Sequence, residues 1–164
     1  MQQKQIIAAL GIIINDEGQF LITLRNDPDN PRAHHKWEIP GGGVEDGETI
    51  EQAVVREVKE EIGVVIELLP FPAISVPVAI QDPHNLERKK LTLVGFIARI
   101  IAGEIKLDFT ETIDYRWVTI EELKQLDYLS KTDIMFEKAS RMLKKDVVPT
   151  SSRLKIARQS EAYY

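Results

Sequence analysis

Apolar residues recur along this chain in short runs and in amphipathic stretches, and the pattern predicts a mixed α/β fold. Runs rich in β-branched residues and bounded by turn residues predict strands, whereas a 3.6-residue period predicts helices. Strands are expected over residues 5–14, 19–25, 36–39, 64–69, 73–80, 91–102 and 115–118. Helices are expected over residues 50–62, 120–126 and 131–145.

Turn and breaker residues indicate how some of these strands pair. The segment Asn15-Asp-Glu-Gly18 separates the first two apolar runs and predicts a turn that joins them as a β-hairpin. Pro77 interrupts the run over residues 73–80. Because proline cannot donate a ladder hydrogen bond, that run is expected to be an edge strand or to carry a bulge. Trp37 is expected in the core.

The helix over residues 50–62 has well-marked ends. Thr49 followed three residues later by Gln52 forms a capping-box pattern, and Gly63 supplies a C-terminal stop. At 100° per residue, the valines of this helix fall in one sector and three glutamates fall in another. One face of the helix is therefore expected to pack, and the other to present carboxylates.

The acidic stripe consists of Glu57, Glu60 and Glu61. Like charges three or four residues apart on a helix repel by a few tenths of a kcal/mol per pair, so the stripe costs stability. Hard divalent cations take oxygen ligands and would turn this cost into a binding site. The stripe therefore predicts a metal site.

A longer motif contains the stripe. The pattern G-x5-E-x7-R-E-Φ-x-E-E-x-G-Φ, with Φ apolar, matches the chain from Gly42 to Val64 at every position. A chance match is on the order of 10⁻⁹ per starting point at average residue frequencies. An ordinary solvated glutamate face explains the charges but not the glycines, the arginine and their spacing. The motif resembles the signature of the Nudix hydrolases.

The resemblance covers about residues 4–145 and implies an α/β/α sandwich with a mixed sheet and a catalytic loop–helix–loop. It also implies pyrophosphohydrolysis of a nucleoside-diphosphate-linked substrate with Mg²⁺, or Mn²⁺ as an alternative. Bound cations screen the charge of a diphosphate and make a bound water more acidic. The residues implied as metal ligands are Glu57, Glu60, Glu61 and the carbonyl of Gly41.

Other catalytic roles also follow from the resemblance. Glu57 is implied to orient or deprotonate the attacking water. Arg56 is implied to orient the glutamates, with Glu48 as a supporting residue. Glycines 41–43 let the backbone approach closely and adopt positive φ, as a loop that delivers backbone groups to a metal–phosphate unit requires.

A second match lies at Glu111, six residues before Trp117. The spacing is similar to that of MutT-like members, in which an acid at this place reaches the metal site and is discussed as the base. Asp108 and Asp114 are alternatives for the same role. A solvated loop glutamate is the competing interpretation, since acidic loop residues are mostly exposed.

The motif recognises a diphosphate and leaves the attached group open. The short chain and the Trp37-Glu-Ile-Pro approach favour a MutT-like nucleoside triphosphate hydrolase, with oxidised purine nucleotides as one option. Alternatives are a pyrophosphatase for ADP-ribose, a nucleotide sugar or a dinucleoside polyphosphate, and a sensor that binds a nucleotide without cleaving it. Candidate phosphate contacts are Arg25 and a basic loop over residues 88–90. For the base, the resemblance implies Ile39 and Asp133, with Asp127 as an alternative to Asp133.

Composition agrees with one small domain over residues 1–146 and a polar, basic tail over residues 147–164. No run of about 18 apolar residues is present, so no membrane span is expected. The absence of cysteine fits a reducing cytoplasm. The net charge of −5 contains a segment of −5 over residues 42–64 and one of +5 over residues 138–164, so no strongly basic nucleic-acid-binding face is indicated. The resemblance leaves a homodimer open.

Overall fold

The structure, a computed structural model, describes residues 5–81 and 88–145. The predicted tail over residues 147–164 lies outside the described residues. The strands are β1 (Gln5–Ile13), β2 (Phe20–Arg25), β3 (Trp37–Glu38), β4 (Gly41–Gly43), β5 (Val65–Leu68), β6 (Ile74–Gln81), β7 (Arg88–Ala102) and β8 (Thr112–Val118). The helices are α1 (Ile50–Ile62), α2 (Ile120–Leu123) and α3 (Thr132–Lys145).

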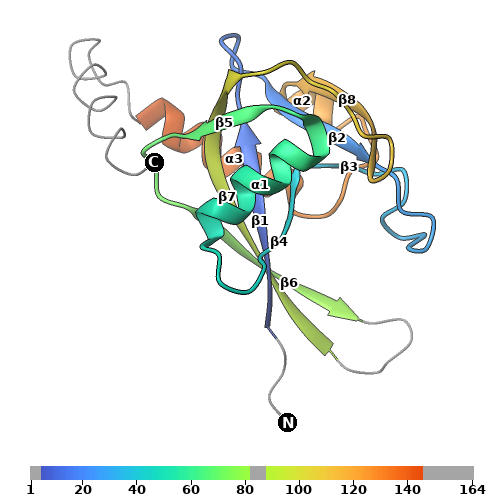
Figure 1. The fold of residues 1–164 in the computed structure, drawn as a ribbon. Coiled ribbons are helices and arrows are strands. Elements are labelled where there is room, and N and C mark those ends of the chain that lie inside the picture. The colour runs from blue at the N-terminus through green and yellow to red at the C-terminus, as the bar shows by residue number, and fades with distance from the viewer. Residues whose placement is uncertain (1–4, 82–87, 146–164) are drawn as a thin grey trace.

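The strands form two sheets (Figure 1). In the larger sheet the order is β4-β1-β7-β5, and β6 also pairs with β7. Strand β1 is parallel to β7 and antiparallel to β4, so this sheet is mixed, as expected. The smaller sheet has the order β3-β2-β8. Among the described strands β6 pairs only with β7, which confirms the edge position predicted from Pro77.

The predicted hairpin of the first two strands is wrong. The turn forms, with the Asn15 N–H donating to the Gln19 carbonyl, but β1 and β2 lie in different sheets and a single bridge, Ile14 to Phe20, links the segments. Strand β1 pairs instead with β7 over nine residues. Near the end of β1 both faces of the strand are buried, one in each core cluster. The position of β1 therefore depends on neighbouring strands and on the helices that cover the sheet, and a local turn signal does not encode these partners.

Strand β7 begins earlier than predicted. It starts at Arg88, opposite Gln81 of β6, so residues 88–90 belong to a strand and not to the basic loop that the sequence suggested. The reason is that the antiparallel ladder between β6 and β7 continues to this pair.

Helices cover both faces of the strand layer, which gives the predicted α/β/α arrangement (Figure 1). Helix α1 packs Val54, Val58 and Ile62 against one face. Helices α2 and α3 pack against the opposite face, where Phe136 stacks on Phe20 with ring centroids 4.3 Å apart. The functional motif therefore lies on the α1 side of the strands.

The ends of α1 agree with the sequence prediction. Thr49 and Gln52 form both hydrogen bonds of the capping box, and Gly63 ends the helix at φ 77°. The left-handed conformation is one that glycine adopts without steric cost. Both ends of α1, the helix that carries the acidic stripe, are therefore fixed by local hydrogen bonds.

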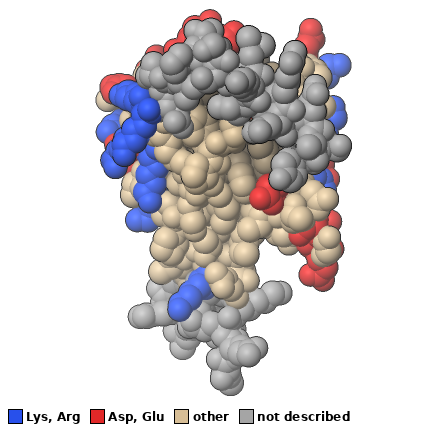
Figure 2. All heavy atoms as spheres, turned by 90° about the vertical axis from the view of Figure 1, so that its left-hand side faces the viewer, with Lys and Arg blue, Asp and Glu red and all other residues tan. Residues whose placement is uncertain are grey.

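Two further properties bear on partners. None of the helices in residues 5–81 and 88–145 is both long and apolar enough to cross a membrane. On the face that Figure 2 shows, lysine and arginine side chains of the described residues gather along the left side and at the lower end, and most of the remaining described surface is uncharged.

Candidate active site

The glycines of β4 bring two parts of the chain unusually close together. Strand β4 runs antiparallel to β1, with Gly41 opposite Leu10 and Gly42 opposite Ala9. Gly41 has φ 145°, and a Cβ atom there would lie 2.1 Å from the Ala9 carbonyl oxygen. A Cβ atom on Gly42 would lie 2.6 Å from the carboxylate of Glu57. Glycine is therefore required at position 41 for β4 to lie against β1, and at position 42 to leave room for the Glu57 carboxylate.

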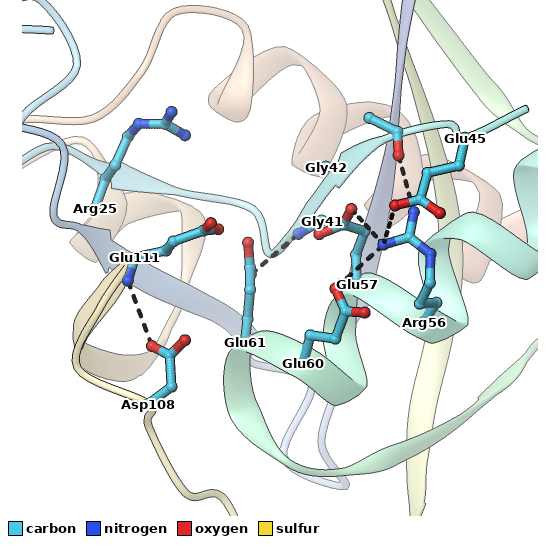
Figure 3. Close-up of a pocket in the computed structure, with 11 residues that line it drawn as sticks. Arg25, Gly41, Gly42, Glu45, Arg56, Glu57, Glu60, Glu61, Asp108 and Glu111 are labelled. Carbon is cyan, nitrogen blue, oxygen red and sulfur yellow. Dashed lines mark hydrogen bonds and ion pairs between the residues drawn. The ribbon is translucent and has the colours of Figure 1, made fainter. Parts of the chain in front are cut away.

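Arg56 connects the glutamates of the motif (Figure 3). Its guanidinium donates to both Glu48 oxygens at 2.7 and 3.0 Å, to Glu57 at 2.7 Å and to Glu60 at 3.1 Å. It also donates to the Gly43 carbonyl at 3.0 Å. These hydrogen bonds lower the pKa of Glu48 and raise that of Arg56. Arg56 thus links the loop and the helix through hydrogen bonds, and its orienting role stays a prediction.

Glu61 differs from the other motif glutamates because it is buried, with 7% of its surface exposed. Its carboxylate accepts a hydrogen bond of 3.2 Å from the Gly41 N–H. Burial, together with the nearby Glu38, Glu57 and Glu111, raises the pKa of Glu61 to about 9, and the Gly41 hydrogen bond opposes this shift. Its environment therefore lacks compensating positive charge.

These groups surround one cavity of about 510 Å³ (Figure 3). The residues that line it are Arg25, Gly41, Gly42, Gly43, Glu45, Arg56, Glu57, Glu60, Glu61, Asp108 and Glu111. Six carboxylates and two guanidinium groups give this wall a formal charge of −4. A polyphosphate entering the cavity alone would be repelled, so an anionic substrate needs cations with it.

Most of the predicted site residues reach this cavity. Glu48 does not line it but contacts it through Arg56. Arg25 reaches the wall, with its guanidinium held by Asp27 at 2.8 Å and by Glu38 at 3.3 Å. Ile39 is 3% exposed in the core and Asp133 lies on the first turn of α3, and neither lines the cavity. Contacts of those two residues with substrate would have to be made elsewhere.

The three loop acids differ in their surroundings. The Glu111 carboxylate points toward Glu61 (Figure 3). Asp108 also lines the cavity, but its oxygens accept hydrogen bonds from Thr110 and from the Glu111 N–H, and the Thr110 hydroxyl lowers its pKa. Asp114 is not part of the cavity wall. Glu111 is therefore the loop acid best placed to act with the α1 glutamates.

Glu38 is a site residue that the sequence analysis missed. It pairs with Thr23 across β2 and β3, and its side chain is only 16% exposed. Burial raises its pKa to about 7 even though Arg25 opposes the shift, and Glu111 contributes to it. The available signal was an acidic residue directly beside Trp37, which was expected in the core.

The donor chemistry of the cavity fits a hard divalent cation. Carboxylate oxygens are the ligands that Mg²⁺ and Mn²⁺ prefer, and the wall carries excess negative charge. In the described part of the chain, however, no three acidic or histidine side chains are already gathered closely enough to hold a metal ion. Arg56 engages both Glu57 and Glu60. A cation would therefore have to compete with Arg56 for these two carboxylates.

Comparisons with known proteins identify relatives of this chain. Nucleoside triphosphatase NudI of Enterobacter sp. (strain 638) is 29% identical over 143 residues, which cover 83% of this chain and 96% of the relative. The crystal structure of a MutT protein from Methanosarcina mazei Go1 is 27% identical, with TM-score 0.68 and coverage of 86% of this chain and 96% of that chain.

A C. elegans Ap4A hydrolase in a binary complex shares the fold, with TM-score 0.69 and 20% identity over 85% of this chain and 98% of that one. The family model of the NUDIX domain matches residues 4–138. That range contains both sheets, α1 and the whole cavity wall. The chain belongs to the Nudix family.

Proposed function

We propose that this hydrolase of phosphoanhydride bonds is a metal-dependent pyrophosphohydrolase that converts a nucleoside triphosphate to a monophosphate and pyrophosphate. The observation that carries the proposal is a cavity wall of six carboxylates and two guanidinium groups built on the loop and helix of the Nudix motif. Its volume and charge suit a polyphosphate chain with accompanying cations. The similarity to NudI, named a nucleoside triphosphatase, favours this substrate class.

In this mechanism Glu57, Glu60 and Glu61 would hold Mg²⁺, and the Gly41 carbonyl is a backbone candidate for the same role. The metal would polarise the phosphoryl oxygens and make a bound water more acidic. Glu57 would orient the attacking water or accept its proton, and Glu111 is the alternative base, because its carboxylate points toward Glu61.

Arginines have two different tasks in the proposal. Arg56 keeps Glu57 and Glu60 in place through hydrogen bonds of 2.7 and 3.1 Å. Arg25 lines the cavity from β2 and offers positive charge to a phosphate. Its own partners, Asp27 and Glu38, fix its guanidinium before substrate binds.

The test is magnesium-dependent hydrolysis of a panel of nucleoside triphosphates, oxidised nucleotides, dinucleoside polyphosphates, ADP-ribose and nucleotide sugars. Glu57→Gln is expected to remove most turnover, since losing one charged contact in such a site costs several kcal/mol of transition-state stabilisation. Glu51→Gln is the matched control, because Glu51 is an exposed acid on the same helix and is not part of the cavity wall. Equal rates in wild type and Glu57→Gln would refute the proposed role.

Products identify the substrate class. Monophosphate plus pyrophosphate from a triphosphate supports the proposal. Cleavage restricted to ADP-ribose, a nucleotide sugar or a dinucleoside polyphosphate would assign the chain to the alternative pyrophosphatases. Nucleotide binding without any cleavage would favour a sensor. A homodimer and a cytoplasmic location remain predictions, and light scattering of the purified protein tests the first.

A further inference from the structure

The cavity has no apolar wall. Its lining consists of three glycines, two arginines and six acids. Such a surface suits phosphates and cations, but a nucleobase has apolar faces that proteins usually hold by stacking against aromatic rings. If the substrate is a nucleotide, as proposed above, its base must rest on a surface beside this cavity.

Few exposed side chains offer such a surface. In the described parts of the chain, the exposed large hydrophobic residues are Val65, Ile101, Phe109 and Tyr115. Only the last two are aromatic, and Phe109 is the more exposed, at 66% against 39%. Phe109 directly follows Asp108 and precedes Glu111 by two residues, and both acids line the cavity. Phe109 is therefore an open aromatic ring within the loop that forms the cavity rim.

The backbone of this loop holds Phe109 in an unfavourable conformation. Its φ is 60°, the left-handed region that a bulky residue rarely adopts, at a cost on the order of 1–3 kcal/mol. The Asp108 carboxylate accepts from the Thr110 N–H at 2.9 Å, and Asn26 donates to the Thr110 carbonyl at 2.9 Å and to the Glu111 carbonyl at 2.7 Å. The loop is thus fixed on both sides of Phe109.

This conformation brings no packing in return, because the ring remains mostly in water. A single exposed aromatic residue needs no special explanation by itself. Here, however, the exposed ring coincides with a fixed loop, a strained backbone and a cavity that lacks an apolar wall. Together these observations select one residue for contact with the planar part of a ligand.

We propose that Phe109 is a substrate-positioning residue that stacks on the nucleobase while the acidic cavity holds the polyphosphate and its cations. The inference rests on the proposed function and extends it to the base. Every base has a π face, so stacking tolerates different bases and gives purines, with their larger rings, the greater benefit.

Kinetics of Phe109→Ala test the proposal. Stacking of one base is worth about 1–3 kcal/mol, so KM for a purine nucleoside triphosphate is expected to rise roughly 5- to 150-fold while kcat changes by less than about twofold. Phe109→Tyr keeps the ring and is expected to restore KM. An unchanged KM in Phe109→Ala would overturn the inference.

A binding measurement separates this inference from the proposed hydrolysis. Affinities of wild type and Phe109→Ala for a nucleoside monophosphate and for ribose 5-phosphate are measured with Mg²⁺ present. The variant is expected to lose affinity for the nucleotide only. Equal losses for both ligands would contradict stacking, whereas absent turnover in wild type with a selective loss would overturn only the hydrolase proposal.

Two control variants test whether Tyr115 is the stacking residue instead and whether relief of backbone strain at Phe109 affects KM. Tyr115→Ala removes the other exposed aromatic side chain, on β8, and is expected to leave KM unchanged. A rise in KM for this variant and not for Phe109→Ala would transfer the role to Tyr115. Phe109→Gly relieves the left-handed backbone, so it is expected to raise the melting temperature yet to show the same rise in KM as Phe109→Ala.

Discussion

Gly42→Ala is expected to disable hydrolysis with little effect on folding. In the structure the new Cβ atom would lie 2.6 Å from the Glu57 carboxylate, whereas ordinary contacts begin at 3.4 Å, so the carboxylate must move by at least 0.8 Å. The obstacle is a side chain and not backbone, and Gly42 does not have a positive φ. The Glu57 side chain can therefore move aside while the backbone fold stays intact.

The expected loss follows from this displacement. A catalytic group misplaced by about 1 Å costs on the order of 100-fold in rate, or about 2.7 kcal/mol of activation free energy. The free energy of unfolding is expected to change by less than about 1 kcal/mol, because alanine also reduces the freedom of the unfolded chain. The two measurements should thus separate: a large fall in kcat and a nearly constant melting temperature.

The assay is kcat at saturating Mg²⁺ on the best substrate of the panel, together with thermal unfolding. Gly43→Ala is the matched control, because a Cβ atom there would meet no atom within 4 Å. It is expected to keep kcat within about threefold, given its open surroundings. The reasoning would be refuted if Gly42→Ala kept wild-type kcat, or if both variants lost activity equally.

Two further predictions concern stability. Glu61→Gln is expected to stabilise the metal-free protein. The pKa of Glu61 is about 9 in the folded state against 4.5 in the unfolded state, so between these values the folded state binds one more proton than the unfolded state. The free energy of unfolding of the wild type therefore falls as pH rises through this window, by on the order of 3 kcal/mol at pH 7, and the variant lacks this loss. Denaturant unfolding at pH 5 and pH 8 checks this, and a steeper pH dependence in the variant would contradict it. Phe136→Ala removes the ring stacked on Phe20 and is expected to cost about 3–5 kcal/mol, measured by the same unfolding method; a loss below 1 kcal/mol would refute the importance of this contact.

Locally encoded features could be predicted well. The bounds of α1 agree with the sequence prediction because Thr49, Gln52 and Gly63 act through hydrogen bonds within a few residues. The composition of the cavity wall was largely predictable for a related reason, since one motif carries Arg56 and three of its acids. What the motif could not supply is the opposite wall, where β2 and the loop before β8 bring in other residues.

Features that depend on distant partners were not predictable in the same way. The turn at residues 15–18 suggested a hairpin, yet β1 pairs with a strand more than 80 residues away. Glu38 directly follows Trp37, which the sequence places in the core, and only the pairing of β3 with β2 shows that Glu38 meets Arg25. Ile39 is buried in the core, which its sequence context did not indicate, and its contact with a base stays a prediction. Burial depends on which elements cover a residue, and a short segment does not specify that.

The carboxylates of the cavity divide into two groups with different consequences for metal binding. Glu57 and Glu60 are already paired with Arg56. A cation at these carboxylates therefore contributes only the difference between its own binding free energy and that of the guanidinium it replaces. Glu61 is buried beside Glu38 and Glu111, and its raised pKa shows that its ionisation is opposed by its surroundings. A cation placed near Glu61 would relieve this cost directly, whereas one near Glu60 would first have to displace an ion pair. Most of the favourable free energy of metal binding is therefore expected from the Glu61 side of the cavity, with Arg56 holding the remaining carboxylates until the metal and substrate arrive.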